Sequence, residues 1–164
     1  MKPQQAFGKK TRIQNWLMQE GWQVGEAQAE NAAWALLATN QNGQGALVIQ
    51  PQQFADMLFV QANMAFDESF RQQYQTLDQA KRQQVLWSLR IGLVQMNVDF
   101  EGIQEPFERL SVSQRIYDDG LTKDNFAQRV MQVKMAMFFA VWTIMRAMEQ
   151  PPPDTWPESI GGVS

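Results

Sequence analysis

The chain has 164 residues, of which 45% are hydrophobic and 19% are charged, and its formal net charge at pH 7 is −3. This composition predicts a globular chain with a sizeable core, and the acidic balance gives no electrostatic reason to expect nucleic acid or an anionic membrane as a partner. The sequence contains no His and no Cys, which excludes disulfides, zinc sites with His or Cys ligands, and any mechanism with imidazole as the general base.

The first third of the sequence predicts one helix followed by strands. A helix is expected over residues 9–20, with a capping box formed by Thr11 and Gln14 at its start. The alternation in Trp22-Gln23-Val24 resembles the start of a short strand. Apolar segments separated by turn-forming residues then predict an antiparallel meander of three strands. These strands are expected at 31–39, 46–50 and 56–64.

The middle of the sequence predicts a helix in two parts over residues 67–96. Asp67 is expected to cap the first part, and Thr76 with Gln79 has the spacing of a capping box at the bend. The inward face of the second part is predicted to contain Val85, Leu86, Trp87, Leu89, Leu93 and Met96. Two further strands are expected at 98–100 and 110–117.

The last helix, from its N-cap at Thr122 to about Met148, carries the strongest functional signal. Its first apolar stripe consists of Val130, Val133, Met137, Val141, Ile144 and Met148. Its second apolar stripe consists of Met131, Met135, Phe138, Trp142 and Met145. The second stripe lies roughly 100° around the helix axis from the first, so the helix has more apolar surface than one sheet face needs. The surplus is explained by packing against other helices, by a homodimer, or by a groove for a partner segment, and the second stripe is the predicted partner or dimer contact.

Other polar groups are weaker candidates. The acid pairs could supply carboxylates for acid–base chemistry or a hard cation, although acids near turns commonly serve in capping and solvation. These pairs are Asp99 with Glu101, Glu105 with Glu108, and Asp118 with Asp119. Lys9, Lys10 and Arg12 are expected to form a solvated helix face. No catalytic residue, metal ligand or cofactor is predicted.

The sequence predicts a cytoplasmic protein without membrane insertion. Its longest apolar run, at 135–145, is shorter than the roughly 17–25 residues that span a bilayer, and it is expected to be a buried helix. No apolar segment typical of a secretory signal follows Met1. We expect one domain over residues 1–149 and a Pro- and Gly-rich flexible tail over residues 150–164.

Three segments carry a family resemblance: residues 16–22, 88–100 and 115–122. They resemble an uncharacterised prokaryotic family with the fold of type III secretion chaperones and sensory-transduction regulators, and the likeness extends over residues 7–149. The resemblance implies an α+β fold with the order helix, three strands, helix, two strands, helix, and an antiparallel five-stranded sheet with helices packed on it. The longer final helix and the Pro-rich tail differ from the secretion chaperones.

The resemblance also implies an acidic, cytoplasmic, often homodimeric protein that binds another polypeptide and performs no chemistry. We therefore expect a non-enzymatic protein- or peptide-binding module, chaperone-like or regulatory, which forms a homodimer and has a client polypeptide as a further possible partner. One alternative is a small-ligand binder with an apolar pocket under the last helix. Another is a carboxylate-based enzyme that uses Asp99, Glu101, Asp118 and Asp119.

Overall fold

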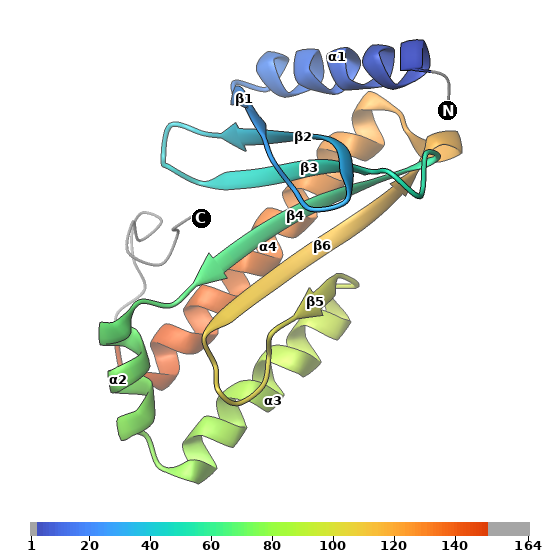
Figure 1. The fold of residues 1–164 in the computed structure, drawn as a ribbon. Coiled ribbons are helices and arrows are strands. Elements are labelled where there is room, and N and C mark those ends of the chain that lie inside the picture. Colours follow the sequence, from blue (N-terminus) through green and yellow to red (C-terminus); the bar gives the residue numbers. More distant parts are fainter. Residues whose placement is uncertain (1–2, 151–164) are drawn as a thin grey trace. The chain divides into compact units, whose positions relative to one another are not determined.

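The computed structural model describes residues 3–150, with side chains from Gly8 onward (Figure 1). The predicted tail lies outside the described residues, apart from Gln150. The described chain divides into two compact units. Unit 1 comprises the residues up to Gln61 together with Gln114–Val130, and unit 2 comprises Ala62–Ser113 together with the residues from Met131 onward.

The elements confirm an α+β chain with an antiparallel sheet (Figure 1). The helices are α1 (Pro3–Gln19), α2 (Glu68–Thr76), α3 (Gln79–Gln95), the short 3₁₀ helix η1 (Asp118–Gly120) and α4 (Lys123–Ala147). The strands are β1 (Gln23–Ala27), β2 (Ala32–Thr39), β3 (Gly45–Pro51), β4 (Met57–Ala65), β5 (Asp99–Glu101) and β6 (Arg109–Tyr117). Within residues 3–150 the sheet has six strands in the order β1-β2-β3-β4-β6-β5.

The predicted count of five strands is wrong because the sheet has a further edge strand, β1. β1 pairs antiparallel with β2, with Val24 opposite Ala38. It is an edge strand whose residues are exposed or half-buried throughout, so it lacks the run of alternating apolar residues by which a half-buried strand is recognised. Only the short alternation around Val24 indicated its presence.

Unit 1 is built on the predicted meander of β2, β3 and β4, which the register confirms. Leu36 lies opposite Val48, and Val48 lies opposite Val60, with all three side chains fully buried. α1 packs on β1 and β2, and its Ile13 and Leu17 are buried. This helix begins at Pro3, so Thr11 lies inside it and the predicted capping box is wrong.

Unit 2 contains the two-part helix, and its caps are partly as predicted. The side chain of Asp67 caps α2 by accepting a hydrogen bond from the Phe70 backbone N–H at 2.7 Å, which confirms the first prediction. α3 is capped by Asp78, which accepts from the Lys81 N–H at 2.8 Å. The capping box predicted at Thr76 is therefore wrong; its hydroxyl instead donates to the Gln73 carbonyl at 2.6 Å.

The buried face of α3 is narrower than predicted. Its buried side chains are Val85, Leu86, Leu89 and Leu93. Trp87, which was predicted to extend this face, is 58% exposed. At about 100° per residue, Trp87 lies roughly 200° from Leu89 and therefore on the opposite side of the helix. Met96 is the half-buried C-cap of α3.

The strand predicted at 110–117 and the predicted N-cap of the last helix are both confirmed. The inward residues of β6 alternate along the strand and are buried: Leu110, Val112, Gln114 and Ile116. The turn at 118–120 is η1. The hydroxyl of Thr122 accepts from the backbone N–H of Asn125 at 3.1 Å, which confirms this residue as the N-cap of α4.

Candidate functional site

The two stripes of α4 have different environments. Five residues of the first stripe are buried, with exposed fractions between 0% and 5%: Val130, Val133, Met137, Val141 and Ile144. Met148, the last of this stripe, is half-buried. The apolar run at 135–145 is thus part of a helix with one buried face. By length and composition, α4 also passes a test for a membrane-crossing helix, but a core helix of a soluble protein passes the same test.

The second stripe of α4 is only partly covered by the rest of the described chain. Met131 is 54% exposed, Met135 45% and Trp142 48%, while Phe138 and Met145 are half-buried. The rings of Phe138 and Trp142 lie 5.6 Å apart at an interplanar angle of 33°. Packing within residues 3–150 thus covers this stripe only in part, and none of its five members is charged.

α3 carries a second exposed apolar face, which sequence reasoning missed. Trp87 is 58% exposed, Ile91 54% and Val94 65%. Their spacing of four and three residues places them on one side of the helix. The guanidinium carbon of Arg90 lies 5.6 Å from the centre of the Trp87 ring, and the same guanidinium donates to the Ile103 carbonyl at 2.6 Å. This spacing is a sequence signal for an exposed face, but Trp87 was predicted to lie on the buried face.

A groove of about 620 Å³ runs between α3 and α4 inside unit 2. Its α3 side includes Val85, Ser88, Ile91 and Gly92, and its α4 side includes Phe139, Thr143 and Arg146. The two helices are in direct contact at Gly92, whose Cα lies against the ring of Phe139. The amide of Gln132 on α4 donates to the carbonyl of Met96 at 2.7 Å. The groove is open to solvent and has both polar and apolar lining, unlike the enclosed apolar pocket expected for a small-ligand binder.

The candidate carboxylates do not gather into a metal site. Among the described residues, no group of three or more acidic side chains could hold a metal ion. Asp118 forms an ion pair with Lys9. Glu105 accepts from the Tyr74 hydroxyl at 3.2 Å and pairs with Arg82 at 3.6 Å. These acids therefore serve as partners of nearby cations and hydroxyls.

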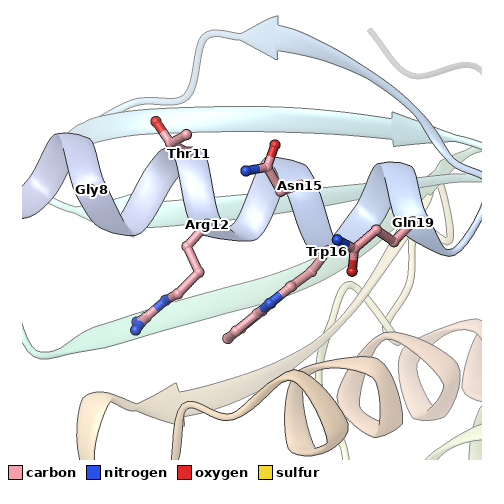
Figure 2. A pocket seen from close by; sticks show the side chains of 6 residues that line it. All are labelled: Gly8, Thr11, Arg12, Asn15, Trp16 and Gln19. Carbon is pink, nitrogen blue, oxygen red and sulfur yellow. The ribbon is translucent and has the colours of Figure 1, made fainter.

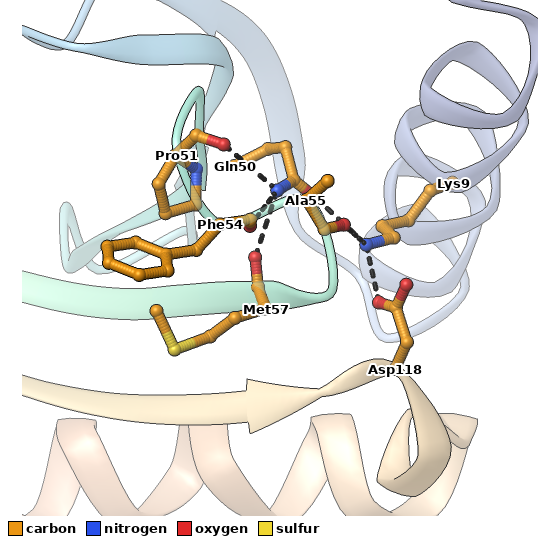
Figure 3. Close-up of polar contacts among 7 residues, drawn as sticks. All are labelled: Lys9, Gln50, Pro51, Phe54, Ala55, Met57 and Asp118. Carbon is orange, nitrogen blue, oxygen red and sulfur yellow. Dashed lines mark hydrogen bonds and ion pairs between the residues drawn. The ribbon is translucent and has the colours of Figure 1, made fainter. Parts of the chain in front are cut away.

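Lys9 is buried, so the prediction of a solvated face is wrong at this residue. It is 6% exposed, and its ammonium donates to Gln50 Oε1 at 2.9 Å and to the Ala55 carbonyl at 3.0 Å, beside the ion pair with Asp118 (Figure 3). The amide of Gln50 donates in turn to three carbonyls of the β3–β4 connection, those of Pro51, Phe54 and Met57. Three acceptors occupy the three N–H groups of Lys9. The cluster therefore holds the β3–β4 connection in place, and the Lys9 amine is not free for chemistry.

A shallow depression of about 560 Å³ lies on the outer side of α1 (Figure 2). The guanidinium carbon of Arg12 lies 5.3 Å from the centre of the Trp16 ring, and that ring lies 5.9 Å from Phe126. Figure 2 shows Arg12 and Trp16 on one side of the helix and Thr11 with Asn15 on the other. The arrangement provides one cation stacked on one aromatic ring and no converging set of donors or acceptors.

Comparison with known proteins gives a family and a structural neighbour. A family model described as "Uncharacterized conserved protein (DUF2299)" matches residues 9–144. The chain is also similar to a crystal structure of an uncharacterized protein from Methanothermobacter thermautotrophicus, with 25% sequence identity and a TM-score of 0.78. That alignment covers 85% of this chain and 98% of the other. No curated protein matches the sequence.

Proposed function

We propose, for a chain that belongs to the DUF2299 family of uncharacterized conserved proteins, a non-enzymatic role as a protein- or peptide-binding module that acts as a homodimer. The single observation that carries this proposal is the exposed second stripe of α4. Fully burying one large apolar side chain contributes about 1.5–3 kcal/mol. A face of five such residues therefore has a substantial free-energy incentive to be covered, and contiguous exposed apolar patches commonly mark interaction sites.

A second copy of the chain fits this face because the face bears no charge. In a two-fold symmetric dimer the same patch of both subunits meets itself, so charges of a single sign on the patch would repel one another. Met131, Met135, Phe138, Trp142 and Met145 avoid that repulsion. Three of the five are methionines, whose unbranched thioether side chains adapt to the facing surface.

The binding role itself is supported by the resemblance of residues 16–22, 88–100 and 115–122 to a family with the chaperone-like fold, and by the composition. We propose that the dimer acts in the cytoplasm and binds a client polypeptide, in a chaperone-like or regulatory role. A non-enzymatic role agrees with a sequence that contains neither His nor Cys, since His is the most frequent general acid or base in enzymes.

The test is the mass of the full chain in solution, measured by sedimentation velocity across a micromolar concentration series. We expect a dimer for the wild-type chain. Trp142→Ala should weaken it by about 30-fold or more, as for a typical interface hot spot that contributes about 2 kcal/mol, while circular dichroism stays unchanged. Trp87→Ala, which removes a tryptophan of α3 that is also about half exposed, is the matched control and should leave the dimer intact. A wild-type monomer throughout the series would overturn the proposal.

A further inference from the structure

The charges of α3 and α4 differ from those of the whole chain. Residues 79–96 contain Lys81, Arg82 and Arg90 and no acid, and residues 125–148 contain Arg129, Lys134 and Arg146 and no acid. The chain as a whole nevertheless has a net charge of −3. The two helices that border the groove are therefore cationic on an otherwise acidic chain, and an anionic occupant is favoured there.

Two of the cations, Lys81 and Arg146, line the groove, and of these Arg146 is the more available. Arg82 pairs with Glu105 at 3.6 Å and donates to Gln75. Lys81 lies 3.9 Å from Glu149, at the limit of an ion pair. Arg146 is exposed and has no ion-pair partner within residues 3–150. The groove thus combines an apolar part formed by Val85, Gly92 and Phe139 with cations at the end where α4 stops.

We propose that residues 151–164 of the same chain occupy the α3–α4 groove. This segment contains Asp154 and Glu158 and no Lys or Arg, so its charge is complementary to that of the two helices. It also contains three apolar side chains that suit the groove, those of Trp156, Ile160 and Val163. A large aromatic side chain that fills a pocket between charged residues is a common anchor in protein recognition.

The last described residues of α4 lie at the groove. Glu149 has a φ of 56°, the Gln150 N–H donates to the Met145 carbonyl at 2.9 Å, and the Glu149 N–H donates to the Arg146 carbonyl at 3.1 Å. This is the Schellman pattern, which turns the chain away from the helix axis. Ala147 and Glu149 themselves line the groove, so the described part of the chain ends close to it.

The length of the segment is sufficient. Pro151-Pro152-Pro153 favours an extended polyproline II path at about 3.1 Å per residue, so Trp156 can lie roughly 19 Å beyond Gln150. Along α3, Lys81 and Gly92 are roughly 17 Å apart at 1.5 Å per residue. Trp156 can therefore reach Gly92 and Phe139, with Asp154 on the path that starts beside Lys81 and Arg146.

This inference is independent of the homodimer. No residue of the second stripe lines the groove, so a second copy on the stripe and residues 151–164 in the groove do not compete. A monomeric wild-type chain would overturn the proposed function and leave the groove assignment standing.

The experiment uses the full chain, which has no native Cys. Ser159→Cys, labelled with a nitroxide, should broaden the backbone amide signals of Ser88, Gly92 and Thr143 in the nitrogen-15 correlation spectrum, and reduction of the nitroxide should restore them. Broadening elsewhere, with these signals unaffected, would overturn the inference.

Two variants and one mixture complete the test. Arg146→Glu should abolish the broadening, whereas Lys134→Glu, a cation of the same helix outside the groove, should retain it. The dispersion of the spectrum shows that each variant is folded, and broadening that survives Arg146→Glu would contradict the charge argument.

Broadening in an unlabelled nitrogen-15 chain mixed with nitroxide-labelled nitrogen-14 chain would show that a second copy supplies the segment, and would overturn the assignment to the same chain.

Discussion

Gly92 on α3 lies so close to Phe139 on α4 that a Cβ added to the glycine would overlap three carbons of the phenylalanine ring. The contact between these helices therefore depends on the absence of a side chain at residue 92. Phe139 is itself half-buried and lines the groove, so the same pair determines both the separation of the helices and the shape of the groove.

Gly92→Ala should lower the free energy of unfolding by about 1–2 kcal/mol, as judged by chemical denaturation. An alanine in a helix interior gains up to about 1 kcal/mol over glycine in helix propensity, but the overlap with Phe139 outweighs that gain. In the Phe139→Ala background the same substitution should instead be neutral or stabilising. Equal effects in both backgrounds would contradict the contact.

Lys9→Met should destabilise unit 1 by about 2–3 kcal/mol, because it leaves Asp118, Gln50 and the Ala55 carbonyl without their donor. The cost is below that of a fully buried ion pair since Asp118 is 40% exposed and can be hydrated. Lys10→Met is the matched control and should change stability little, because its partner Glu26 is 81% exposed. Thermal unfolding of both variants measures the difference, and equal melting temperatures would refute it.

Asp78→Ala should cost about 1 kcal/mol, the usual value for loss of an N-cap side chain. Thr76→Ala should change stability by no more than about 0.5 kcal/mol, because its hydroxyl donates to an exposed carbonyl and caps nothing in α3. Urea denaturation of the two variants ranks the effects. The reverse ranking would restore the capping box that the sequence predicted.

Stability should fall at alkaline pH because of Tyr74. Burial and the neighbouring Glu105 carboxylate raise the pKa of Tyr74 far above its ordinary value of 10.0. Above about pH 10 the unfolded chain therefore loses this proton while the folded chain keeps it, and the free energy of unfolding declines as the pH rises. Tyr74→Phe should remove this part of the decline. The difference between the two proteins, measured by urea denaturation, should be constant from pH 7 to 9 and shrink above pH 10.

The sequence predicted the elements that carry strong periodicity. The meander of β2, β3 and β4, the strand β6 and the cap at Thr122 are confirmed. Counting apolar residues around α4 also predicted a surplus of apolar surface, because two stripes on one helix exceed what a single contact face can bury, but it left open what covers the second stripe.

The remaining features depend on tertiary contacts that periodicity does not encode. Lys9 lies one helical turn before the buried Ile13, but its charge argues against a buried position, and only the fold brings Gln50 and Asp118 to it. β1 is held by its pairing with β2 and has no apolar pattern of its own. The exposed face of α3 was obscured because Trp87 was grouped by its hydrophobicity with Leu86 and Leu89 rather than by its angle on the helix.

The methionines of the second stripe give it a chemical sensitivity that the buried core lacks. Met131 and Met135 are about half exposed, whereas Met57, Met64 and Met137 are at most 5% exposed. Peroxide should therefore convert Met131 and Met135 to sulfoxides before the buried methionines, together with Met18 of α1, which is 50% exposed. Each conversion replaces a flexible apolar group with a polar one. In a chain without thiols, oxidative damage would thus reach the proposed subunit contact while the buried core stays intact.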